Sequence, residues 1–147
     1  MTTIREATAA DLAGVVLMAQ HFIDSAPYGA SIPNDVEHCE RVVAQLLSLG
    51  VVLVADCDGM LVGMLAGAVY PHFLTGRQTA SESFWWVEPD ARGKTLADDL
   101  LAAFTAWALN RGAVVLELGS RHKVLDRFYE RRGFTAVERV FQKELSR

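Results

Sequence analysis

The segment Arg92-Gly93-Lys94-Thr95 combines residue types that suit the binding of a phosphate group. Arg92 and Lys94 bring positive charge, and Gly93 has no side chain, so a ligand can approach its backbone closely. The segment opens a predicted helix, and the first turn of a helix carries unpaired N–H groups and the positive end of the dipole. These residues therefore predict an anion-binding site, with an ordinary solvated helix start as the alternative.

A strand and a long helix must position this segment. Residues 84–87, Phe-Trp-Trp-Val, are aromatic or β-branched and predict a strand. Pro89 and Asp90 then indicate a turn. The helix is predicted from an apolar series at helical spacing, formed by Leu96, Leu100, Phe104, Trp107 and Ala108.

One nucleotide-binding pattern contains a similar Gly-Lys-Thr group. The P-loop pattern GxxxxGK[ST] would end at Gly93-Lys94-Thr95 and requires glycine at position 88, where this chain has Glu88. A degenerate P-loop would also want a carboxylate at the end of a neighbouring strand, where only Glu117 is available. We treat this as a failed match.

Two motifs resemble those of the GCN5-related N-acetyltransferase (GNAT) family. Residues 87–97 resemble the family's strand, short turn and R-G-x-G-x-G/A helix start, with Thr95 where the family usually has glycine. Residues 128–134, Phe-Tyr-Glu-Arg-Arg-Gly-Phe, resemble its FYEKLGF run. The motifs occur in the family's order with one predicted strand between them, and the resemblance covers most of the chain.

The resemblance implies that acetyl-CoA is the cosubstrate and lies against this strand and helix. It implies that pyrophosphate meets N–H groups of Arg92, Gly93, Lys94, Thr95, Leu96 and Ala97, and that pantetheine pairs with the backbone of Trp85, Trp86 and Val87. His122 stands where many members have a cofactor-contacting asparagine, and a ring nitrogen could make a similar hydrogen bond. A solvent-exposed loop histidine is the alternative.

The resemblance also implies direct attack of an amine on the thioester, with Tyr129 as general acid for the CoA thiolate. A phenol has an unperturbed pKa of about 10, so it keeps its proton at neutral pH. The alternative places Tyr129 at the edge of a core face covered by Val124 and Phe128. Glu82 is a candidate general base on the motif strand, although an outward-facing strand residue is the alternative, and some family members use no dedicated base.

Composition indicates one globular domain spanning residues 1–147, since 51% of the chain is apolar. The net charge of −4 argues against general nucleic-acid binding. Cys39 and Cys57 are expected to be reduced, buried core residues. We expect a soluble cytoplasmic protein without a membrane segment, because no signal-like or transmembrane run occurs. No pattern predicts a metal site.

The patterns predict an α/β (α+β mixed) domain whose mostly antiparallel central sheet has helices on both faces. The expected order is β-α-α-β-β-β-α-β-α-β, with an optional last strand. The expected strands are 2–6, 51–55, 60–70, 81–87, 113–118, 134–140 and 140–145. The expected helices follow Thr8 and cover 34–49, 96–110 and 123–132. Gly63 and Gly67 interrupt one strand, which indicates a bulge or a close backbone approach.

We therefore expect an acetyl-CoA-dependent N-acetyltransferase that acts on a small-molecule or peptide amine, as a monomer or a homodimer. The alternative is a non-catalytic acyl-CoA-binding sensor or interaction module on the same fold. The loops expected to shape the acceptor pocket, 24–33 and 71–79, carry no recognisable signature.

Overall fold

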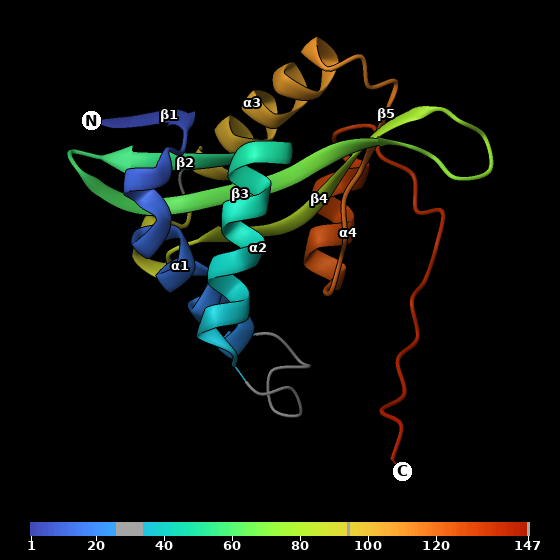
Figure 1. The fold of residues 1–147 in the computed structure, drawn as a ribbon. Coiled ribbons are helices and arrows are strands. Elements are labelled where there is room, and N and C mark those ends of the chain that lie inside the picture. Colours follow the sequence, from blue (N-terminus) through green and yellow to red (C-terminus); the bar gives the residue numbers. More distant parts are fainter. Residues whose placement is uncertain (26–33, 94, 147) are drawn as a thin grey trace.

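A computed structural model describes residues 1–25, 34–93 and 95–146 of the chain (Figure 1). Five strands are described, namely β1 (Thr2–Glu6), β2 (Val51–Cys57), β3 (Met60–Pro71), β4 (Gln78–Val87) and β5 (Val115–Glu117). The longer helices are α1 (Leu12–Ser25), α2 (Val36–Leu49), α3 (Leu96–Asn110) and α4 (Lys123–Glu130). Short 3-10 helices η1 (Ala9–Asp11) and η2 (Pro89–Ala91) precede α1 and α3.

The strands form one mixed sheet in the order β1-β2-β3-β4-β5. The first four strands are antiparallel neighbours, and β5 lies parallel to β4 across the α3 crossover. Asp58 and Gly59 form the tight β2–β3 turn, and both have positive φ, 51° and 91°. The predicted mixed, mostly antiparallel sheet is therefore confirmed.

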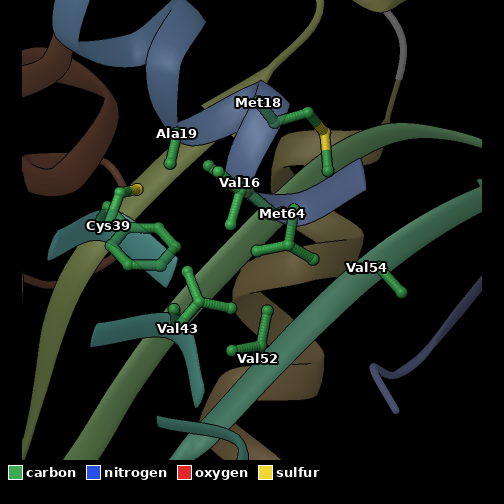
Figure 2. Packing of buried hydrophobic residues seen from close by; sticks show 11 residues of the cluster. Val16, Met18, Ala19, Cys39, Val43, Val52, Val54 and Met64 are labelled. Atoms are coloured by element: carbon green, nitrogen blue, oxygen red, sulfur yellow. The ribbon is translucent and has the colours of Figure 1, made fainter. Parts of the chain in front are cut away.

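Helices cover both faces of the sheet, as expected (Figure 1). On one face, α1 and α2 pack on β2, β3 and β4, and Figure 2 shows Met18, Val43 and Met64 meeting in this core. On the other face, α3 packs Leu100 and Phe104 against the sheet. The continuous apolar run of β2 is buried on both sides, which explains why its sequence does not alternate.

A β-bulge in β4 depends on Gly67 of β3. Gly67 pairs with Glu82 and Ala66 pairs with Phe84, which leaves Ser83 as the extra residue. A Cβ on Gly67 would lie 2.3 Å from the Ser81 carbonyl oxygen and 2.7 Å from the Phe104 ring. The glycine predicted to mark a close backbone approach does so, and it lets β4 change direction between Ser81 and Phe84.

The C-terminal strand prediction was wrong. The structure has no strand in residues 131–146, where strands 134–140 and 140–145 were expected. The apolar side chains there, such as Val140 and Phe141, are exposed. Alternating apolar residues favour a strand only where another strand or a core receives them, and none of the described strands pairs with that segment.

Helix α4 also differs from its prediction in what it buries. It ends at Glu130 rather than near residue 132, and Val124, expected in the core, is 76% exposed. Tyr129, expected at the edge, is instead the buried residue of the helix and is 7% exposed. The helix docks through this tyrosine because Trp85 and Phe134 pack on its ring.

We predict that Gly67→Ala lowers the free energy of unfolding by about 2–3 kcal/mol, because the added methyl group meets backbone and an aromatic ring that cannot both move away. Chemical denaturation measures this. Gly14→Ala in α1 is the matched control, since its Cβ would meet only the movable end of Leu61, and we expect a change within about 1 kcal/mol. Equal effects of the two variants would contradict the role of Gly67.

Candidate functional site

Strands β4 and β5 separate after three residue pairs. Thr79, Ala80 and Ser81 pair with residues 115–117, and β4 then continues to Val87 with only β3 beside it. No described strand lies along the other edge of residues 82–87. An open strand edge presents unpaired N–H and C=O groups, so this gap can accept an extended ligand that carries amides.

The open edge of β4 leads to the start of α3. Gly93 has a φ of 77°, in the left-handed region that favours glycine, and nothing lies within 4 Å of where its Cβ would be. Thr95 is the N-cap but makes no side-chain cap, because its hydroxyl donates to the Asp99 carboxylate at 2.8 Å. The first-turn N–H groups, including those of Leu96 and Ala97, thus have no intrahelical partner. The prediction for Lys94 lies outside the described residues.

Arg92 is held at the end of β4. Its Nε donates to the Val87 carbonyl oxygen at 2.9 Å, and its guanidinium lies 4.6 Å from the centre of the Trp86 ring. The rest of the guanidinium keeps a positive charge at the mouth of the gap. Arg92 therefore closes the turn between β4 and α3 in addition to bringing charge to it.

Two carboxylates share the first turn of α3. Asp98 pairs with Arg132 of the second motif at 2.5 Å, and Arg132 lowers the pKa of that carboxyl. Asp99 accepts the Thr95 hydroxyl hydrogen bond. Acidic residues at this position are favoured by the helix dipole, and they oppose the binding of an anion at the same N–H groups.

Tyr129 and Glu82 meet at Gly119, just beyond β5. The Tyr129 hydroxyl donates to the Gly119 carbonyl oxygen at 2.8 Å, and the Gly119 N–H donates to Glu82 Oε2 at 3.0 Å. Glu82 of β4 and Tyr129 of α4, which are 47 residues apart in the sequence, thus share Gly119 in the loop after β5. The two candidate catalytic groups lie on the two sides of the gap between β4 and β5.

Burial changes the acidity of both groups. Burial raises the pKa of Tyr129 above its usual value, and the nearby Glu82 carboxylate raises it further. The phenol therefore stays protonated throughout the physiological range. Burial also raises the pKa of Glu82, while the Gly119 hydrogen bond and the charge of Arg121 act in the opposite direction.

Trp85 and Trp86 lie on opposite faces of β4, as strand geometry requires. Trp85 stacks on Tyr129, with ring centres 6.3 Å apart, whereas Trp86 meets Phe22 of α1 edge to face at 6.4 Å. The indole N–H of Trp86 is buried and has no hydrogen-bond partner among the described residues. It is a donor that a ligand oxygen would satisfy.

His122 is the N-cap residue of α4, but its side chain makes no cap hydrogen bond. Its carbonyl oxygen accepts from Ser120 Oγ and the Asp126 N–H, so the described bonds use its backbone. The side chain is exposed at the end of the loop that follows β5. It lies three residues after Gly119 in the sequence, and its predicted cofactor contact stays a prediction.

Sequence reasoning missed two residues around the gap, Arg121 and His21. The Arg121 guanidinium lies 4.8 Å from the centre of the Phe22 ring, which links the loop after β5 to α1. His21 Nδ1 lies 2.8 Å from Glu88 Oε1 at the far end of β4. Only the short polar loop after a predicted strand could have indicated Arg121, since loops carry no periodicity.

The described ranges contain neither a candidate metal site nor a membrane-spanning helix. Residues 1–25, 34–93 and 95–146 contain no group of three or more His, Cys, Asp or Glu side chains placed to hold a metal ion. None of the helices in these ranges has the length and hydropathy needed to cross a membrane. Cys39 and Cys57 are both free thiols.

Comparison with known proteins adds evidence from outside the chain. The sequence model of the acetyltransferase (GNAT) family matches residues 17–134. No curated protein shows a significant match.

Many solved structures share the fold. An acetyltransferase from Trypanosoma brucei has a TM-score of 0.78 at 23% identity, over 99% of this chain and 100% of the other. The aminoglycoside N-acetyltransferase AAC(6')-Iy, solved with a CoA bisubstrate analogue, has a TM-score of 0.80 at 16% identity over 99% of each chain. The ribosomal-protein-alanine N-acetyltransferase of Brucella melitensis biovar Abortus 2308 has a TM-score of 0.76 at 21% identity over 98% and 99%.

Sequence identities of 16–23% do not show that this chain shares a substrate with these proteins, but the structural similarity establishes the fold. The family model covers most of the chain, including both motifs and the gap between β4 and β5. The protein belongs to the GNAT family of acetyltransferases.

Proposed function

We propose that this protein binds acetyl-CoA and transfers its acetyl group to a primary amine of a small molecule or a peptide. The observation that carries the proposal is the open edge of β4 at residues 82–87, which runs directly to the uncapped N-terminus of α3. This arrangement offers strand amides and helix N–H groups in one line. It suits a long ligand with amides at one end and phosphates at the other.

The residues present fit such a ligand. The backbone of Trp85, Trp86 and Val87 would hold the pantetheine arm, and the N–H groups at Gly93, Thr95, Leu96 and Ala97 would hold the pyrophosphate. Arg92 would add charge near the phosphates, together with Lys94. Acetyl-CoA supplies an activated thioester whose acyl group an amine can attack directly.

In this proposal Tyr129 and Glu82 would move protons in the gap. The Tyr129 hydroxyl keeps its proton because burial raises its pKa, and it can give that proton to a leaving thiolate. Glu82 can take a proton from an ammonium acceptor, directly or through water. A raised pKa brings a carboxylate closer to neutrality and makes it a better base for this task.

Relatives support the two acceptor classes without choosing between them. AAC(6')-Iy acts as an aminoglycoside N-acetyltransferase, and the Brucella protein is named for a ribosomal-protein alanine. In this chain, Trp86, Phe22 and Arg121 border the gap on the α1 side, where an acceptor would approach. An aromatic wall with one cation and one buried carboxylate suits an amine that also carries an anionic or carbonyl group.

One observation favours a non-catalytic acyl-CoA-binding role on the same fold. The Tyr129 hydroxyl already donates its hydrogen bond to Gly119, so it would have to leave that carbonyl to act as an acid. A sensor would bind acetyl-CoA as tightly with phenylalanine at position 129, and no amine would be turned over by the parent protein.

We predict that acetyl-CoA binds with a micromolar dissociation constant and that Gly93→Asp weakens binding by roughly tenfold or more, since a carboxylate would face the pyrophosphate. Isothermal titration calorimetry measures this. Gly112→Asp is the matched control, because Gly112 has a φ of 80°, equally open space and a place at the other end of α3. Equal loss in both variants, or heat with Mg-ATP alone, would contradict the proposal.

We predict that Tyr129→Phe lowers kcat by about 100-fold and changes the acetyl-CoA dissociation constant by less than about twofold, because only proton donation is removed. Steady-state kinetics with a screened amine measures the first, and calorimetry the second. Tyr70→Phe is the control, as it removes a phenol whose only described hydrogen bond is a long one, 3.4 Å, to Glu117. Unchanged turnover in Tyr129→Phe would remove the tyrosine from the mechanism.

We predict that Glu82→Gln is more stable than the parent protein at pH 7–8 and that this advantage disappears at low pH. Burial raises the pKa of Glu82, so the folded state binds a proton that the unfolded state has lost. Stability of the parent therefore falls as the pH rises from about 4.3, the ordinary glutamate value, through the raised value. Denaturation at several pH values tests this, and parallel curves would contradict the burial of Glu82.

A further inference from the structure

The two neighbouring tryptophans of β4 each begin a set of ring contacts that spans the gap. On the α4 face, Trp85 stacks on Tyr129, which follows β5 in the chain, with ring centres 6.3 Å apart. On the α1 face, Trp86 meets Phe22 at 6.4 Å, and the Arg121 guanidinium lies 4.8 Å from the centre of that phenyl ring. Arg121 belongs to the loop after β5, so this second set of contacts also joins the two sides of the gap. Trp86, Phe22 and Arg121 are here called the α1-side bridge.

Two members of the bridge are fixed by the fold. Phe22 and Trp86 are partly buried, and both pack on the core between the sheet and helices α1 and α2. His21, the residue before Phe22, has its Nδ1 2.8 Å from Glu88 Oε1, which ties the end of α1 to the segment after β4. The aromatic part of the bridge therefore has little freedom to move away from the gap.

Arg121 is the exposed member of the bridge. The residue two positions before it, Gly119, bonds both candidate catalytic side chains, and Ser120 Oγ donates to the His122 carbonyl oxygen at 3.1 Å. These contacts hold the loop backbone on both sides of Arg121. A cation–π contact at an exposed site is weak, so a ligand can displace the guanidinium from Phe22 without moving the loop.

A thioester in this gap would be open to attack by water as well as by an amine. In hydrolysis, a water oxygen forms a bond to the acyl carbon, the C–S bond breaks, and the thiolate takes up the proton that water loses. The products are acetate and CoA. A site that keeps water away until the acceptor arrives prevents this loss. Trp85 and Tyr129 cover the α4 face of the gap, and the α1-side bridge covers the face from which an acceptor would approach.

We propose that Phe22 and Arg121 determine the specificity for an amine over water. In the absence of an acceptor, the α1-side bridge closes the α1 face of the gap and keeps water from the thioester. The acceptor opens this face by displacing the Arg121 side chain from the Phe22 ring, and Trp86 and Phe22 then remain as the wall beside it. The inference rests on the proposed function, because it concerns the gap in which acetyl-CoA would lie.

The test is hydrolysis of acetyl-CoA by the full chain in a buffer without primary amines, followed by chromatographic measurement of free CoA. We expect Arg121→Ala and Phe22→Ala each to raise the hydrolysis rate about tenfold over the parent protein, because water then reaches the thioester from the α1 face. Calorimetry with CoA measures binding in the same variants. We expect the dissociation constant to change by less than about twofold, since the proposed cosubstrate contacts lie on β4 and α3.

Two variants serve as matched controls. Arg111→Ala removes another exposed arginine that lies over an aromatic ring, that of Trp107 at 5.4 Å, but at the C-terminal end of α3. Phe22→Tyr keeps an aromatic ring beneath Arg121. We expect both controls to hydrolyse acetyl-CoA at the parent rate. Circular dichroism verifies the folding of each variant, and Arg121→Ala decides the test if Phe22→Ala does not fold, because Arg121 is exposed.

Faster hydrolysis confined to Arg121→Ala and Phe22→Ala would support the role of the bridge. An unchanged rate in Arg121→Ala, or an equal rise in Arg111→Ala, would overturn that role, whereas binding of acetyl-CoA by the parent protein would leave the proposed function standing. A parent protein that binds no acetyl-CoA would overturn the proposed function and the role of the bridge together. The binding measurement therefore distinguishes the two failures.

Discussion

The separation of β4 from β5 after three residue pairs is the constraint on which the site depends. A parallel pair that continued to Val87 would satisfy every backbone group of β4 and leave no edge for a ligand. The extra residue of the bulge, Ser83, comes two residues after Ser81, the last residue of β4 that pairs with β5, and Gly67 permits the bulge by allowing the Ser81 carbonyl to approach. Gly119 then occupies the start of the gap, where its N–H donates to Glu82 and its carbonyl oxygen accepts from the Tyr129 hydroxyl. Backbone geometry, more than any single side chain, therefore creates the opening.

The same packing that supports the fold sets the chemistry of the two candidate groups. Tyr129 anchors α4 through Trp85 and Phe134, and the burial that this requires raises its pKa. Glu82 on β4 is likewise partly buried, and this burial raises the pKa of its carboxyl. The residue that anchors α4 is thus also the candidate proton donor. Truncating the Tyr129 side chain would remove both roles at once, whereas removing the hydroxyl alone leaves the ring packing in place.

Much of this arrangement could be predicted from the sequence. Helical spacing from Leu96, the aromatic strand before it and the glycine in β3 are local signals, and each led to the correct element. The depth of Tyr129 was not predictable, because Val124 and Phe128 are more apolar and the docking partner Trp85 lies far away in the sequence. Arg121 was missed since a short loop has no period. The strands expected at residues 134–145 were wrong, because an alternating pattern favours a strand but does not identify its neighbour.

The order of strands in the sheet is the same as their order in the chain. The β2–β3 and β3–β4 pairs join strands separated only by a turn or a loop, and such contacts close small loops at low entropic cost. The other two pairs are interrupted by helices, since α1 and α2 lie between β1 and β2 and α3 lies between β4 and β5. During synthesis, the sheet through β4 can form before β5 and α4 leave the ribosome. The candidate site is then completed last, by the final quarter of the polypeptide docking onto a preformed scaffold.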